Sequence, residues 1–105
     1  MTPGKAAAQA GHAFLDSFLR SPLQDRQAYL NDGGTKIVLT VPDEAALSEL
    51  FFRARKAGLP CAMVIEQDHV MPPHFDGSPV PTAVGIGPIA RDAARAITRD
   101  LPLLK

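Results

Sequence analysis

The chain has 105 residues, and its 11 lysines and arginines balance 11 aspartates and glutamates, so the formal net charge at pH 7 is zero. The length fits one domain over residues 1–105, and an apolar fraction of 46% excludes a chain too polar to form a core. No apolar run reaches the ~18 residues that a membrane span needs and no secretory signal is found, so we expect a cytoplasmic protein with no membrane partner.

The first predicted element is a helix from about Pro3 to Leu19. Thr2 suits the N-cap position and Pro3 the first helical position, and apolar residues then recur every three or four positions. Lys5 falls in the first turn, beside the positive end of the helix dipole, where a cation is unfavourable. An ammonium next to free backbone N–H groups can bind an oxyanion or a phosphate. The alternative is a frayed terminal lysine.

After the first helix, Ser21-Pro22 stops the pattern and a short helix through Asp25–Leu30 follows. Three apolar or β-branched runs predict strands at 36–41, 61–65 and 82–87. Two further runs predict helices, at about 43–57 and 90–98. Because a strand, a helix and a strand follow closely, we expect a right-handed crossover with parallel strands. The fold class is therefore α/β, a single layered domain in which helices flank a small mixed β-sheet.

Glu66 is a candidate for the centre of a functional site. It closes the apolar run 61–65 at the predicted carboxyl end of a parallel strand, and ligand crevices form beyond such ends. A Glu66–Lys5 pair could orient a water molecule and stabilise the charge that develops in ester hydrolysis. Alternatively, Glu66 is a carboxylate that caps the loop after the strand.

Three other side chains are weaker candidates. Gln9 and His12 lie three residues apart, on neighbouring faces of the first helix. A partly buried, hydrogen-bonded His12 is the simpler interpretation, and proton transfer is the alternative. Thr82 opens a predicted strand, where its hydroxyl could bind an ester carbonyl or a water molecule, or could reflect β-propensity alone.

The proline-rich segment 67–81 and the cysteine bear on other kinds of chemistry. Two aspartates and two histidines in this segment have no regular metal-ligand spacing, so no metal site is expected: Asp68, His69, His74 and Asp76. Four prolines predict a stiff, semi-ordered flap. Cys61 is the only cysteine, and its position in an apolar strand predicts an inert core thiol in a reducing compartment.

Two groups of basic residues are candidates for a nucleic-acid-binding surface, although the balanced net charge does not favour one. One group lies near the end of the third helix, at Arg53, Arg55 and Lys56. The other recurs at four-residue intervals, at Arg91, Arg95 and Arg99. This spacing gives one helical stripe, which is more often a solvated face than an RNA-binding surface.

Several sequence blocks follow one another along the chain. The first is Gly4-Lys5-(x)3-Gln9-(x)2-His12-Ala13, and the others are residues 34–39, 41–44, 57–60, 82–88 and 97–103. In this order and at nearly this spacing, the blocks resemble the peptidyl-tRNA hydrolases of the second, archaeal and eukaryotic type.

The resemblance implies an esterase that cleaves the ester between a peptide and the terminal ribose of its tRNA, with no cofactor. It implies that Lys5 binds a phosphate or polarises the ester, that Glu66 positions the water and that Thr82 assists. Gln9 and His12 would shape the cleft, and the segment with Asp68 and His69 would contact the substrate. The alternative is a non-catalytic relative that binds RNA or a protein on the same fold.

The sequence also departs from the family pattern. Glu66 stands where the family has an aspartate, and residues 67–70 replace the rest of its DAG-R-T motif, so Asp68 is an alternative site carboxylate. The strand that the family places before its Gly-Lys helix is not found. We therefore expect about a dozen further residues upstream of Met1, or else an exposed sheet edge that favours a partner strand or a homodimer.

Overall fold

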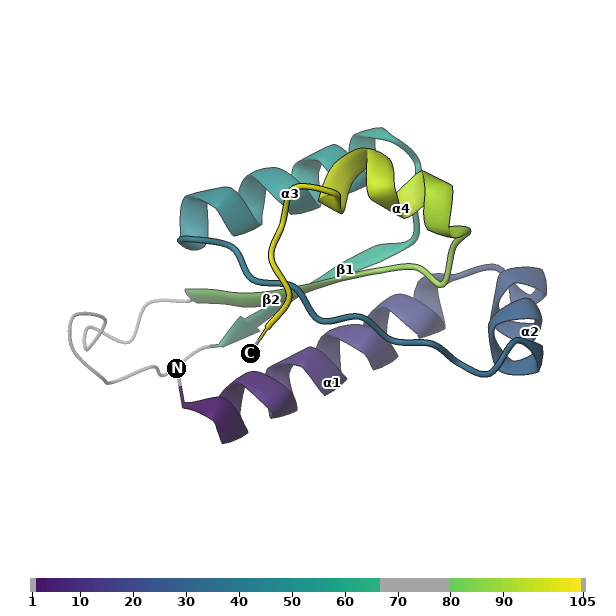
Figure 1. Ribbon diagram of the computed structural model, residues 1–105, viewed down its shortest axis with the longest axis horizontal. Coiled ribbons are helices and arrows are strands. Elements are labelled where there is room, and N and C mark those ends of the chain that lie inside the picture. Colours follow the sequence, from purple (N-terminus) through teal and green to yellow (C-terminus); the bar gives the residue numbers. More distant parts are fainter. Residues whose placement is uncertain (1, 67–79, 105) are drawn as a thin grey trace.

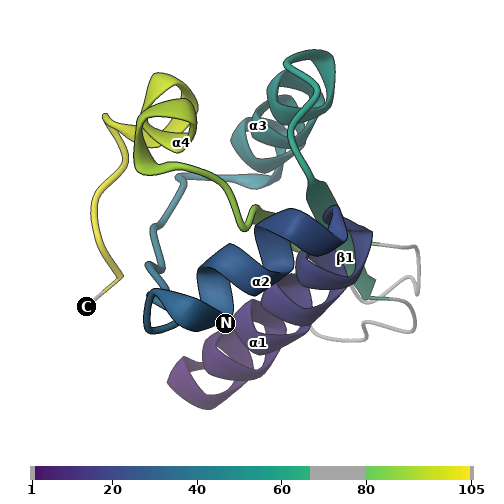
Figure 2. The ribbon, with the colours of Figure 1, turned by 90° about the vertical axis from the view of Figure 1, so that its right-hand side faces the viewer.

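The computed structural model describes residues 2–66 and 80–104 and contains a two-stranded sheet with helices on both faces (Figure 1). Its elements, in chain order, are α1 (Pro3–Arg20), α2 (Leu23–Asn31), α3 (Glu44–Lys56), β1 (Cys61–Glu66), β2 (Val80–Ile86) and α4 (Arg91–Thr98). Helix α1 covers one face of the sheet, and α3 covers the other with α4 beside it (Figure 2). No helix in this part of the chain is long and apolar enough to cross a membrane.

Helix α1 begins as the sequence predicts. The Thr2 hydroxyl oxygen accepts a hydrogen bond from the Lys5 backbone N–H at 3.1 Å, and Pro3 occupies the first helical position. Ser21 is the C-terminal cap of the helix. Its backbone is extended, and its N–H donates a hydrogen bond to the Phe18 carbonyl. The cap at Thr2 fixes the backbone of the first turn of α1, from which the Lys5 side chain projects.

Helix α1 lies very close to strand β2. A Cβ atom at Gly85 would be 2.1 Å from the Ala13 carbonyl oxygen and 2.7 Å from the Ala13 carbonyl carbon, so only glycine fits there. Ala62, the residue paired with Gly85 across the sheet, is fully buried. At the far end of the helix the buried Ser17 hydroxyl donates to the Gly87 carbonyl. These contacts set the position of α1, and of its first turns, relative to both strands.

The other predicted helices are confirmed within a few residues. In α3 the Asp43 carboxylate caps the N-terminus, accepting from the Ala46 N–H at 2.8 Å. Gly58 follows the C-terminus with a φ of +75°, the left-handed conformation that glycine adopts at low cost. Ala54 is the buried residue of α3 and is fully inaccessible to solvent. Helices α2 and α4 also form where the sequence places them.

The predicted strand at 36–41 is wrong. Within the described residues, this segment forms only an isolated antiparallel bridge between Leu39 and Leu103. The Thr40 N–H donates to the Pro102 carbonyl at 2.9 Å, and the Leu104 N–H donates to the Val38 carbonyl at 3.0 Å. The parallel crossover to β1 is therefore absent there too. The run is apolar and extended, but these properties do not determine which segment pairs with it.

The α/β class is confirmed as a single layered domain with a small sheet between helices. In the described chain that sheet is antiparallel rather than mixed, because its two strands are β1 and β2. Glu66 still ends a strand at the edge of the sheet, as predicted, but the neighbouring strand begins there. The N-terminus of α1 reaches the same edge (Figure 1).

Candidate active site

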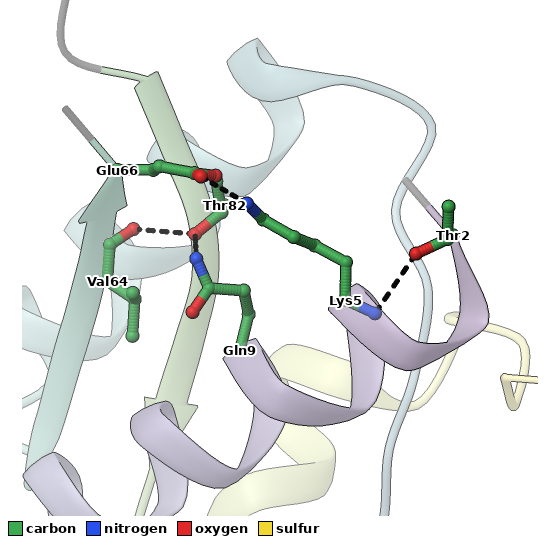
Figure 3. A network of polar contacts seen from close by, with 6 residues as sticks. All are labelled: Thr2, Lys5, Gln9, Val64, Glu66 and Thr82. Carbon is green, nitrogen blue, oxygen red and sulfur yellow. Dashed lines mark hydrogen bonds and ion pairs between the residues drawn. The ribbon is translucent and has the colours of Figure 1, made fainter. Parts of the chain in front are cut away.

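The structure brings Lys5 and Glu66 together. The Lys5 ammonium donates a hydrogen bond to Glu66 Oε1, which joins the first turn of α1 to the last residue of β1 (Figure 3). The Lys5 side chain is 45% exposed and the Glu66 side chain 19% exposed. Pairs this accessible contribute ~0–1 kcal/mol to stability, so folding stability gives little reason for a lysine at the positive end of a helix. The pair is therefore a candidate for a chemical role.

A second contact lies one helical turn further along α1. Gln9 Nε2 donates to the Thr82 hydroxyl oxygen at 3.1 Å, and that hydroxyl donates to the Val64 backbone carbonyl at 3.3 Å. Lys5 and Gln9 are four residues apart, so both point from the same side of the helix toward the strands. Figure 3 shows their side chains converging on the end of the sheet where Glu66 and Thr82 lie.

Thr82 occupies an irregular position in its strand. Val64 pairs with Ala83 and Ile65 pairs with Pro81, so Thr82 is an extra residue that has no partner position in β1. Such a β-bulge redirects a side chain, and bulges are frequent beside active sites. Pro81, which has no N–H for the ladder, stands next to the bulge. The sequence alone does not show which residues of the two strands pair, so it predicts neither the bulge nor the hydrogen bond from Thr82 to the Val64 carbonyl. Pro81 is the one sequence feature that indicates an irregularity in this strand.

Of the remaining predicted site residues, only His12 lies in the described part of the chain, and it makes no hydrogen bond or ion pair with this group. His12 is exposed, so the prediction of a partly buried histidine is wrong, and it has no hydrogen-bond partner in the described chain. Asp68 and His69 lie outside the described residues, as does the segment predicted to form a flap. In the ranges 2–66 and 80–104, no group of three or more potential ligands could hold a metal ion.

Cys61 and the arginine stripe lie away from the Lys5–Glu66 pair. Burial raises the pKa of the Cys61 thiol, although Arg55 and Arg20 lower it in part, and a buried thiol with a raised pKa is unreactive. Arg91 and Arg95 on α4 and Arg99 directly after it are exposed, and α4 lies across the sheet from α1 (Figure 2). The stripe therefore has the exposure of a solvated face.

The sequence of the chain matches a known family and several of its members. Residues 1–104 match the family described as Peptidyl-tRNA hydrolase PTH2. A peptidyl-tRNA hydrolase of Methanococcus maripaludis strain C6 is 37% identical over 109 residues, covering 99% of this chain and 89% of the relative. That of Pyrobaculum aerophilum is 38% identical over 108 residues, with 97% and 86% covered. That of Methanocaldococcus jannaschii is 34% identical over 107 residues, with 99% and 90% covered.

A match over almost the whole chain and relatives at this level of identity agree with the resemblance found in the sequence blocks around Lys5, Gln9 and Thr82. The chain belongs to the peptidyl-tRNA hydrolase PTH2 family.

Proposed function

We propose that this chain hydrolyses the ester bond of peptidyl-tRNA and releases free tRNA, and that Lys5 and Glu66 carry the reaction. The observation that supports this most directly is their pairing at the edge of the sheet. Membership of the PTH2 family and relatives named peptidyl-tRNA hydrolase support the reaction and the substrate. No observation on the described residues favours the non-catalytic alternative.

The two charges suit the two halves of ester hydrolysis. Glu66 accepts a proton from a water molecule, whose oxygen attacks the ester carbonyl carbon. The Lys5 ammonium stabilises the negative charge that develops on the carbonyl oxygen. When the tetrahedral intermediate collapses, the ribose oxygen leaves and takes the proton back from Glu66. These steps balance without a cofactor.

The other site residues have supporting roles in this proposal. Thr82 lies beside Glu66 and contacts the water, and Gln9 shapes the same end of the site. His12, exposed on the same helix, and Asp68 and His69, which follow Glu66 in the sequence, would contact the tRNA or the peptide. The cytoplasmic location and the homodimer remain predictions from the sequence.

The proposal is tested with an N-blocked aminoacyl-tRNA that carries a label on the amino acid. We expect the protein to release the label at a rate that falls by about 10²–10³ in Lys5→Ala, as when a single oxyanion-stabilising donor is removed. A comparable loss is expected in Glu66→Gln.

Matched controls separate this loss from a general effect of charge. Lys56→Ala and Glu49→Gln remove the same charges from exposed positions on α3 and should keep full activity. Release that proceeds equally well in Lys5→Ala, or no release by folded wild-type protein, would contradict the proposal.

A further inference from the structure

The hydrogen bonds at Thr82 have a definite direction. A backbone carbonyl can only accept, so in its contact with Val64 the Thr82 hydroxyl is the donor. The hydroxyl has one hydrogen, and this bond uses it. Gln9 must therefore present its amide NH2 rather than its carbonyl oxygen, in agreement with the 3.1 Å contact from Gln9 Nε2. In the described structure, Thr82 keeps one lone pair to offer and no proton.

The bulge places this lone pair on the side of the sheet where the charged pair lies. In a regular ladder that continued from Val64–Ala83, Thr82 would stand opposite Ile65, on the face away from α1. Instead Ile65 pairs with Pro81, and the extra residue Thr82 turns toward α1, where Gln9 reaches it. Glu66, one residue beyond Ile65, points to the α1 side, as its contact with Lys5 of α1 shows.

We propose that Gln9 is a positioning residue, which acts through Thr82 to fix the orientation of the attacking water. This inference rests on the proposed function. The Thr82 lone pair and the Glu66 carboxylate both accept hydrogen bonds, so a water molecule between them donates one proton to each. Its own lone pair then points away from both, toward the ester carbonyl that Lys5 polarises. Gln9 touches neither water nor ester, and it holds the Thr82 hydroxyl hydrogen on Val64.

This arrangement excludes a role for Thr82 as a donor to the ester carbonyl. The arrangement requires a donor at position 9, because a side chain that only accepts would draw the Thr82 hydrogen away from Val64. Thr82 would then present a hydrogen instead of a lone pair to the water, and the water would turn. Orientation of the nucleophile affects the chemical step and leaves tRNA binding largely unchanged.

The test is a double-mutant cycle of Gln9 and Thr82, in which kcat and KM are measured for each variant with the labelled aminoacyl-tRNA as substrate. We expect Thr82→Val and Gln9→Leu each to lower kcat by about tenfold to a hundredfold with little change in KM. Because Gln9 acts only through Thr82, adding Gln9→Leu to Thr82→Val should change kcat by no more than about twofold. Thr82→Ser, which keeps the hydroxyl, should restore most of the activity. Gln9→Glu, equal in size but without an N–H donor, should lose as much as Gln9→Leu.

Controls and contrary outcomes follow from the same set. Gln24→Leu on α2 and Thr98→Val on α4 make the same substitutions away from the site and should leave kcat unchanged. Thermal unfolding midpoints identify any variant that has lost its fold, and Gln9→Glu tests the inference with Thr82 intact. Losses of Gln9→Leu and Thr82→Val that multiply, or a Gln9→Glu variant with full kcat, would overturn the inference while Lys5-dependent hydrolysis stands. Absence of Lys5-dependent hydrolysis would overturn both proposals.

Discussion

The Lys5 ammonium and the Glu66 carboxylate meet although they are 61 positions apart in the chain, because the first turn of α1 and the last residue of β1 reach the same edge of the sheet. The glutamate neutralises a cation that the helix dipole disfavours. The pair remains accessible, with the lysine 45% exposed, so a substrate can approach the ammonium without unfolding any element.

The ammonium should matter for rate far more than for stability. We expect Lys5→Gln to lower kcat/KM by about 10²–10³, because the charge facing the developing oxyanion is removed. The free energy of unfolding, measured in urea, should hardly change, because exposed ion pairs contribute little. Lys5→Arg keeps the charge but spreads it over a planar group, and it should recover part of the rate. Equal activity in Lys5→Gln and wild type would contradict the role of the charge.

The length of the Glu66 side chain is a second variable, since the family has aspartate where this chain has glutamate. The pairing of Glu66 with Val80 fixes the Glu66 backbone, so a side chain shorter by one methylene cannot reach Lys5 in the same way. We expect Glu66→Asp to lower kcat by about tenfold to a hundredfold, the loss typical of a misplaced group. Glu49→Asp, at an exposed position on α3, is the matched control in the same kinetic assay. Full activity in Glu66→Asp would show that the reaction does not depend on the length of this side chain.

The sequence predicts the Lys5–Glu66 pair because each residue depends on a local signal. The cap at Thr2 and the Pro3 position define the start of α1, and the apolar run before Glu66 defines the end of β1. Both signals are local patterns of a few residues. These signals place each residue at the end of its element, whereas the contact between the two residues depends on the packing of α1 against the sheet.

What the sequence does not predict depends on pairing between distant segments. Residues 36–41 have the composition of a strand, yet they bridge to Leu103 near the C-terminus. The bulge at Thr82 depends on a register shift between Val64 and Ile65, and no pattern in either strand encodes that shift alone. Since the Thr82 orientation follows from the bulge, its hydrogen-bond direction could be derived only from the structure.

The contact between Gly85 and Ala13 predicts a severe loss of stability on a small substitution. Gly85→Ala would place a methyl group 2.1 Å from a backbone oxygen, so α1 must move away from β2. We expect a loss of about 1–3 kcal/mol or more in the free energy of unfolding, measured by urea denaturation. Gly11→Ala in α1 is the matched control, because apart from the adjacent residues and backbone of its own helix no atom lies within 4 Å of the added Cβ. The control should stabilise the protein by about 0.5–1 kcal/mol, and a neutral Gly85→Ala would contradict the close approach.

The raised pKa of the Cys61 thiol makes the free energy of unfolding depend on pH in the alkaline range. Burial raises the pKa of its thiol above the ordinary value of 9.0, against the opposing effect of Arg55 and Arg20. Above 9.0 the unfolded chain loses the thiol proton while the folded chain retains it. The stabilisation is therefore complete below 9.0 and is lost as the pH rises through the folded-state pKa.

The contribution of the thiol is isolated by comparing wild type with Cys61→Ala, because lysine and tyrosine also titrate in this range. The free energy of unfolding in urea is measured at neutral pH and at about pH 10. Cys61→Ala should destabilise the protein at neutral pH, since Cys61 is buried in β1, and this difference should narrow at the higher pH. A difference that stays constant would mean that the folded protein ionises the thiol as readily as the unfolded chain does, and that burial does not govern its pKa.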